Sequence, residues 1–242
     1  MDAIKSQALE AKAWEWTTPV NGQYPRPWMS DTADPAHAAV FIVGRNPATA
    51  IPVEEMPDQG AFIDALFNRH GRSHAKVYAR ARERLGKGPS PTRGRIARLS
   101  ELLEQEGVAG VLETNVICYS TPMSADLHAA VHRGGRAAGV RIFKELLNMV
   151  RPQVLIAHGQ GTRSDLAKIL GRPLPDSPRS LADGVREIVT PLLGDEPRER
   201  ALIILVPSLA PPEWNKWSSW ATDHLDSVAR RAAAYVAMHR SR

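Results

Sequence analysis

The strongest strand signal in the chain is Ala38-Ala39-Val40-Phe41-Ile42-Val43-Gly44-Arg45-Asn46-Pro47, an apolar run that ends in a polar turn. An apolar run without alternation is typical of a strand covered on both faces, as strands of parallel sheets are. Gly44 permits a tight turn at its end, and Pro47 fixes the backbone one residue after Asn46. We therefore expect Asn46 to lie at the tip of a buried strand.

Three more apolar runs follow the same pattern, at residues 110–116, 153–157 and 202–206. Strands that alternate with helices are typical of an α/β fold. We therefore predict a three-layer single domain over residues 1–242, with a central, mostly parallel four-stranded sheet flanked by helices. The segments with helical periodicity are 73–85, 92–106, 135–150, 162–170 and 214–238.

The composition excludes several classes of protein. Of the 242 residues, 43% are hydrophobic and 24% are charged, as in ordinary globular proteins. The one cysteine, Cys118, excludes an internal disulfide and a four-cysteine iron–sulfur cluster. No apolar run is long enough for a membrane span, and the first residues show no export signal. We expect a cytoplasmic protein without a membrane partner, a metal or another cofactor.

Basic residues are concentrated in one segment. Between Arg69 and Arg98 the sequence has ten Lys or Arg residues and one acid, whereas the net charge of the whole chain is +5. The remainder of the chain is therefore net acidic. Such a block is typical of a surface that binds a polyanion, with a solvated helix face as the ordinary alternative. Because part of the block is a Gly- and Pro-rich loop, we expect DNA contacts from Lys87, Arg93 and Arg95.

Polar residues follow the predicted strands. In an open parallel sheet, ligands bind where the strands end on their carboxyl side. Asn46, Asn115 and His158 each stand at such an end, and Ser208 follows the last strand. An asparagine there is about as often a simple turn residue, and a histidine there is more often structural. Their common position makes these strand ends the candidate site.

Together the strand ends resemble the motifs of the uracil-DNA glycosylase superfamily. The order and spacing of the motifs agree from about residue 40 to residue 209. Gly44-Arg45-Asn46-Pro47 is similar to the family's first motif, and Thr114-Asn115 with Pro122 is similar to its Thr-Asn motif. Residues 146–159 are similar to the family's helix–strand stretch. Val206-Pro207-Ser208-Leu209 is similar to its final His-Pro-Ser motif.

The chain departs from that family at three points. Val206 stands where the final motif usually has the His that hydrogen-bonds the uracil carbonyl, and Ala48 stands where a Gly is common. The family branch with the Thr-Asn motif carries an iron–sulfur cluster on four cysteines, which one cysteine cannot hold. The resemblance is therefore to a divergent member.

The resemblance implies roles for the residues around the base. Asn46 would orient the water that attacks C1′ of the deoxyribose. Asn115 would pair with uracil, accepting from N3–H and donating to O4. The remaining residues expected to contact the substrate at these strand ends are Gly44, Arg45, Pro47 and His158.

The resemblance also implies contacts with the flipped nucleotide and the strand. Phe62 or Phe67 would stack on the extruded base, because base-flipping enzymes recover the cost of unstacking in this way. Ser208 would hold the DNA backbone, and Leu209 would insert into the emptied stack.

The activity implied is that of a DNA repair glycosylase that acts in base excision repair. It would hydrolyse the N-glycosidic bond of uracil, and of other deaminated bases, in single- or double-stranded DNA and leave an abasic site. No lysine stands at the strand ends to form a Schiff base, which predicts a monofunctional enzyme. We expect a monomer associated with the nucleoid. The alternative is a weak or inactive glycosylase-like fold that binds damaged or single-stranded DNA.

Other features have ordinary explanations. Two histidine pairs have the i, i+4 spacing of metal ligands on a helix, His70 with His74 and His128 with His132, but no third ligand is evident. The glycine-rich segment 158–164 matches no nucleotide-binding motif. Three tryptophans spaced by three residues predict core packing of a terminal helix: Trp214, Trp217 and Trp220.

Overall fold

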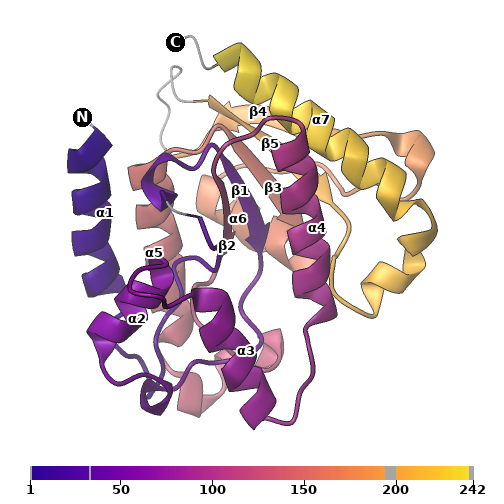
Figure 1. The fold of residues 1–242 in the computed structure, drawn as a ribbon. Helices are drawn as coiled ribbons and strands as arrows, with labels where there is room; N and C mark the ends of the chain where they lie inside the picture. Colours follow the sequence, from indigo (N-terminus) through magenta and orange to yellow (C-terminus); the bar gives the residue numbers. More distant parts are fainter. Residues whose placement is uncertain (1, 33, 194–199, 240–242) are drawn as a thin grey trace. The chain divides into compact units, whose positions relative to one another are not determined.

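The computed structural model describes residues 2–32, 34–193 and 200–239 (Figure 1). Within these residues no helix is long and apolar enough to cross a lipid bilayer. The main elements in this part of the chain are α1 (Asp2–Trp16), β1 (Val40–Gly44), α2 (Gln59–Leu66), α3 (His74–Arg84), α4 (Pro91–Gln105), β2 (Val111–Asn115), α5 (Gly135–Val150), β3 (Val154–His158), α6 (Gln160–Leu170), β4 (Arg186–Pro191), β5 (Arg200–Val206) and α7 (Ala221–His239).

The strands form one sheet in the order β2-β1-β3-β5-β4. β1 pairs with β3 in parallel, β3 pairs with β5 in parallel, and β4 pairs with β5 in antiparallel fashion. The α/β class and the mostly parallel central sheet flanked by helices are confirmed. The described residues contain five strands, however, and not the predicted four.

The additional strand is β4, at the edge of the sheet. Its sequence, Arg186-Glu187-Ile188-Val189-Thr190-Pro191, begins with two charged residues, and most of it is only half-buried. It is the strand before β5 in the chain and pairs with it antiparallel. A half-buried edge strand lacks the continuous apolar run that identified the parallel strands.

The contacts between Cα atoms divide the chain into two compact units, which are described separately. Unit 1 comprises residues 1–37, 45–89 and 112–150, and unit 2 comprises 38–44, 90–111 and 151–242. Helices α1, α2, α3 and α5 belong to unit 1, and α4, α6 and α7 belong to unit 2. The single domain over residues 1–242 stays a prediction.

In unit 2, α4 and α7 cover one face of the sheet (Figure 1). Side chains that point to this face alternate along the strands, as Val40 and Ile42 do on β1. The intervening side chains, such as Phe41 and Leu155, point to the opposite face and are also buried, and α6 packs against β3. Each buried Val, Leu or Ile contributes about 1.5–3 kcal/mol. Burial on both faces explains why β1, β3 and β5 are continuous apolar runs.

The C-terminal helix begins later than predicted. α7 starts at Ala221, and the preceding residues form two short 3-10 helices. A spacing of three residues matches the three residues per turn of such a helix, and it brings the ring centroids of Trp214 and Trp217 to 4.8 Å and those of Trp217 and Trp220 to 5.3 Å. The predicted core packing is confirmed, because Trp217 is buried in the unit 2 core with its two neighbours against it. The α-helical assignment of residues 214–220 is wrong.

Unit 1 contains two helices that the sequence analysis did not predict, α1 and α2. α2 begins after Asp58, whose carboxylate accepts a hydrogen bond from the backbone N–H of Ala61 at 2.7 Å. Most of its residues are buried, so it lacks the polar face by which an amphipathic helix is identified. α1 packs against α2 and α5, and Trp16 of α1 donates to Glu145 of α5 at 2.7 Å.

The segment that follows β2 is held in place by backbone contacts within unit 1. Ile117 N–H donates to the carbonyl of Arg45 at 2.9 Å, and Thr121 N–H donates to the carbonyl of Pro47 at 3.1 Å. From α5, the carbonyl of Gly139 accepts from Cys118 N–H at 3.2 Å. A Cβ atom at position 139 would lie 2.8 Å from that same backbone nitrogen, so only glycine allows this approach.

We predict that Gly139→Ala destabilises the protein by about 1–3 kcal/mol, because the methyl group forces α5 away from the backbone of residues 117–119. Gly94→Ala in α4 is the matched control, since a Cβ there meets nothing within 4 Å. Alanine is the better helix former, so the control should be neutral or slightly stabilising. Urea unfolding of both variants measures the difference, and equal stabilities would contradict the close packing of α5.

Candidate functional site

Asn46 lies in the turn after β1, where two hydroxyl groups hold its amide. Its Nδ2 donates to Thr121 Oγ1 at 2.9 Å, and its Oδ1 accepts from Ser124 Oγ at 2.7 Å. Thr121 in turn donates to the carbonyl of Met123 at 2.7 Å. The amide is therefore fixed in one orientation, with one lone pair of Oδ1 left for a water molecule. Contacts from Thr121 and Ser124 were not expected from the sequence, although both hydroxyl residues follow Asn115 closely in the chain.

Asn115 ends β2 and is 4% exposed. Its side-chain Nδ2 is buried and has no hydrogen-bond partner among the described residues. A buried N–H donor left without an acceptor costs about 1–3 kcal/mol. An acceptor atom that reaches the end of β2, such as a carbonyl oxygen, would satisfy this donor.

The other predicted contacts at the end of β1 are divided between the two units. Gly44 is the last residue of β1 in unit 2, whereas Arg45 and Pro47 belong to unit 1. The carbonyls of Arg45 and Pro47 are occupied by the segment after β2. Both residues thus position Asn46, and their contact with substrate stays a prediction.

Cys118 lies three residues after Asn115 and is fully buried. Burial raises the pKa of its thiol to about 12. The thiol donates to the backbone carbonyl of Asn115 at 3.3 Å. A protonated thiol bonded to the backbone is not a nucleophile at neutral pH, which supports the structural interpretation of this residue.

Phe62 and Phe67 both lie inside unit 1. Phe62 is fully buried and is stacked on Tyr24, with a centroid distance of 4.6 Å. Phe67 packs edge-on against Trp28 at 5.3 Å and has the guanidinium of Arg69 at 4.6 Å from its ring centroid. Each ring is therefore already packed, and stacking on a flipped base stays a prediction for both.

In unit 2, His158 ends β3 directly opposite Val206 of β5. It is 9% exposed, and its Nδ1 has no hydrogen-bond partner within the described ranges. Burial lowers the pKa of His158 to about 4, so the imidazole is neutral at physiological pH. Gly159 follows with φ +86°, a conformation that glycine adopts without strain, and its N–H donates to the carbonyl of Val206 at 2.9 Å.

The loop after β5 carries Ser208 and Leu209. The carbonyl of Ser208 accepts from Trp217 Nε1 at 2.9 Å, and that of Leu209 accepts from Arg95 at 2.7 Å. Leu209 is fully buried in the unit 2 core, so insertion into DNA would require this loop to change conformation. The roles of Ser208 and Leu209 on DNA stay predictions.

The cations of the basic block differ in how they are engaged. Arg95 lies over the ring of Trp214 at 4.3 Å, and burial lowers its pKa, so it serves to fix the β5 loop as well as to carry charge. Lys87 is exposed in the loop before α4, and Arg93 lies in the first turn of α4. Arg69 forms an ion pair with Glu10 of α1 at 2.6 Å.

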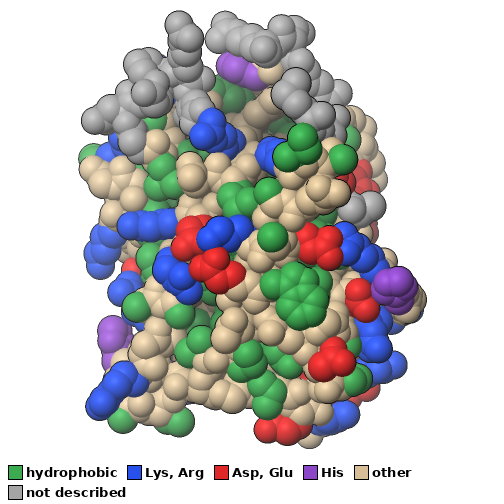
Figure 2. Space-filling model, turned by 90° about the vertical axis from the view of Figure 1, so that its left-hand side faces the viewer, with side chains coloured by type: hydrophobic (Ala, Val, Ile, Leu, Met, Phe, Trp, Pro, Cys, Tyr) green, Lys and Arg blue, Asp and Glu red, His purple; other side chains and the backbone are tan. Residues whose placement is uncertain are grey.

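The face that carries α1 has acidic and basic side chains interspersed (Figure 2). Arg141 of α5 pairs there with Glu15 of α1 at 3.2 Å, and Lys12 pairs with the same carboxylate at 2.6 Å. A cation paired in this way contributes little to the attraction of a polyanion.

In each of the two histidine pairs, one histidine contacts an aromatic side chain. His132 Nδ1 lies 2.9 Å from the hydroxyl of Tyr119, and the His74 ring lies edge-on to Phe62 at 6.0 Å. The described residues contain no group of three or more His, Cys, Asp or Glu that could hold a metal ion.

We predict that the neutral state of His158 makes stability depend on pH. The imidazole has an ordinary pKa of about 6.5 in the unfolded chain and about 4 in the folded one, so the unfolded state binds the proton first as pH falls. Stability should therefore decrease from about pH 6.5 towards pH 4, by about 3 kcal/mol in total from this group. Thermal unfolding of the wild type and of His158→Gln across that range measures the effect.

The slope of stability against pH, not the absolute stability, is the quantity to compare in this experiment. Burial also lowers the pKa of His224, which contributes equally to both proteins. Parallel curves for the wild type and His158→Gln would show that the imidazole is not buried in neutral form.

No protein-family model matches this chain, and no curated protein is significantly similar to it in sequence.

Proposed function

We propose that this protein is a monofunctional DNA glycosylase that hydrolyses the N-glycosidic bond of uracil and leaves an abasic site. The observation that carries the proposal is the buried Nδ2 of Asn115, a donor without a partner at the end of β2. A planar base with a carbonyl at its edge satisfies that donor. Uracil offers O4 as the acceptor. Cytosine has an amino group at that position, so two N–H donors would face each other.

Asn46 would position the attacking water. Its Oδ1 accepts from Ser124 and retains a lone pair, and its Nδ2 is held by Thr121. An amide cannot take a proton from water as a carboxylate does. Its contribution is therefore orientation of the water towards a sugar that already carries positive charge, which predicts a slower enzyme than one with a carboxylate at this position.

His158 would supply the imidazole that is missing at Val206. The two residues are direct partners in the β3–β5 pair, so their side chains point to the same face of the sheet. The low pKa keeps the imidazole neutral, with one N–H to donate. A neutral donor in a buried environment can stabilise an atom that gains negative charge.

The second candidate function is binding of damaged or single-stranded DNA without cleavage. Val206 at the position of the family's His, and an amide rather than a carboxylate at position 46, favour it. An excision assay on uracil-containing oligonucleotides, with products resolved after alkaline cleavage of abasic sites, separates the two functions. Excision supports the glycosylase, and binding without product supports the second candidate.

We predict that Asn115→Asp abolishes uracil excision, because a carboxylate oxygen replaces the N–H donor and repels O4. Asn115→Ala should lower kcat/KM by roughly 5- to 150-fold, which corresponds to the loss of about 1–3 kcal/mol of hydrogen bonding. Asn215→Asp makes the same chemical change at an exposed position and should leave excision unaltered. Wild-type excision by Asn115→Ala would refute the assignment of Asn115.

We predict that Asn46→Asp retains or raises excision, because the Thr121 hydroxyl can turn to donate to the new carboxylate. Asn46→Ala should lower kcat with less effect on DNA binding. Ser124→Ala, which removes one contact that orients the amide, should have a smaller effect in the same direction.

Single-turnover kinetics with binding measured in parallel separate the two effects of the Asn46 variants. Full activity of Asn46→Ala would place the water elsewhere. A covalent enzyme–DNA adduct trapped by borohydride would contradict the monofunctional mechanism.

A further inference from the structure

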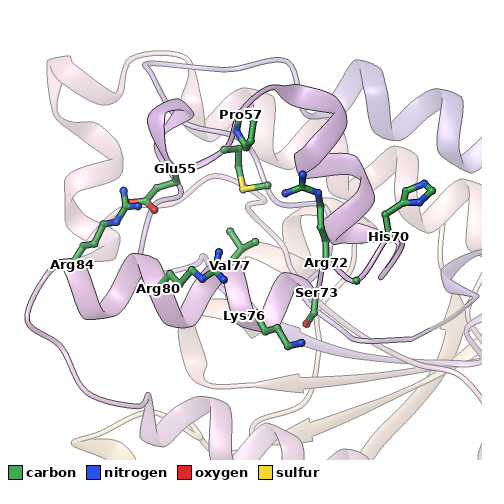
Figure 3. A pocket seen from close by; sticks show the side chains of 11 residues that line it. Glu55, Pro57, His70, Arg72, Ser73, Lys76, Val77, Arg80 and Arg84 are labelled. Atoms are coloured by element: carbon green, nitrogen blue, oxygen red, sulfur yellow. The ribbon is translucent and has the colours of Figure 1, made fainter.

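A pocket of about 450 Å³ lies beside α3 in unit 1 (Figure 3). One wall is formed by α3 and the turn before it, and the opposite wall includes Glu55 and Pro57. The cationic side chains that line it repeat at intervals of four residues: Arg72, Lys76, Arg80 and Arg84. None of these residues belongs to the candidate site around Asn46 and Asn115, and none is among the DNA contacts expected from the sequence.

Most of the positive charge in this pocket is not neutralised by the protein. Arg84 pairs with Glu55 at 2.9 Å, and Glu55 is the one carboxylate among the lining residues. Arg72, Lys76 and Arg80 are exposed, and in the described part of the chain their side chains have no ion pair or hydrogen bond. Three like charges close together repel one another, and a bound anion would remove that repulsion.

The geometry of the row favours a chain of anions over a single one. Lys76 and Arg80 lie four residues apart on α3, so they are separated by about 6 Å along its axis and lie on neighbouring parts of its surface. That step is of the same order as the one between successive phosphates of an extended nucleic-acid strand. Arg72 lies in the turn before the helix and lines the same pocket.

The pocket offers charge but no surface for a base. Its lining includes no Phe, Tyr or Trp, and its apolar residues are Met56, Pro57 and Val77. Proteins that hold the bases of single strands do so by stacking them on aromatic rings. A pocket with cations and without rings would contact phosphates independently of sequence.

We propose that the row formed by Arg72, Lys76 and Arg80 binds consecutive phosphates of a DNA strand. The inference rests on the proposed function in that the polyanion is DNA, but it requires binding only and not excision. It places the main electrostatic contact on α3 and the turn before it, and not on Arg95, which is engaged with Leu209 and Trp214.

The test is the salt dependence of binding to a fluorescein-labelled single-stranded oligo(dT) that contains no uracil, followed by anisotropy. The variant is Arg72→Gln/Lys76→Gln/Arg80→Gln. The control is Arg133→Gln/Lys144→Gln/Arg179→Gln, which removes the same charge from exposed positions outside the pocket. All substitutions lie at exposed side chains, and thermal unfolding checks that both proteins are folded.

For the pocket variant we expect weaker binding and a slope of log K against log salt that is smaller by about 2, since each single-strand phosphate contact contributes about 0.7. The control should keep the wild-type slope. Equal losses in the two variants would overturn the proposal, because the effect would then be one of net charge. An unchanged slope in the pocket variant, or a wild type that does not bind the oligonucleotide, would also overturn it.

Excision measured on the same preparations keeps this inference distinct from the glycosylase proposal. Loss of the salt slope in the pocket variant supports the α3 row even if the wild type excises no uracil. Excision by the wild type together with an unchanged slope in the pocket variant supports the glycosylase and refutes the row.

Discussion

The parallel pairing of β3 with β5 determines the chemistry available at the end of the unit 2 sheet. Its register runs from Val154 opposite Leu202 to His158 opposite Val206. A shift of one residue would turn the imidazole to the other face of the sheet and exchange the side chains that pack on each face. Because β3 and β5 are buried on both faces, that shift is strongly disfavoured. The position of His158 is therefore a consequence of core packing, and its low pKa follows from the same burial.

Asn115 Nδ2 and His158 Nδ1 are among the buried polar atoms that have no hydrogen-bond partner in the described chain. Each lies at the carboxyl end of a strand. Asn46 shows the opposite arrangement, since both ends of its amide are engaged. A buried polar group without a partner costs stability. The contrast within unit 1 is therefore between a donor of Asn115 that lacks an acceptor and an amide of Asn46 that is already held.

The sequence predicted the parallel strands and α5 because their signals are local. Continuous apolar runs identified β1, β3 and β5, and the helix expected over 135–150 has those bounds in the structure. It did not predict α2, which is mostly buried, or β4, which is a half-buried edge strand. At the site, it named Asn46, Asn115 and His158 from their place at strand ends. The hydroxyls of Thr121 and Ser124, and the pairing of His158 with Val206, depend on tertiary contacts that no local pattern encodes.

The electrostatic effect of the basic block depends on the contacts that each of its side chains makes in the fold. Ten cations within one segment are equivalent in the sequence, yet the structure assigns them different environments. Arg69 and Arg84 are neutralised by carboxylates, and Arg95 is fixed by a carbonyl and an indole ring. Lys76 and Arg80 of α3, and Arg72 in the turn before it, remain exposed and line one pocket. Exposed ion pairs contribute little to stability. A carboxylate reduces the positive potential near the cation that it pairs with, whereas the potential near Arg72, Lys76 and Arg80 is not reduced in this way. The local attraction of a polyanion therefore depends on which cations the fold leaves unpaired, and not only on the net charge of the chain.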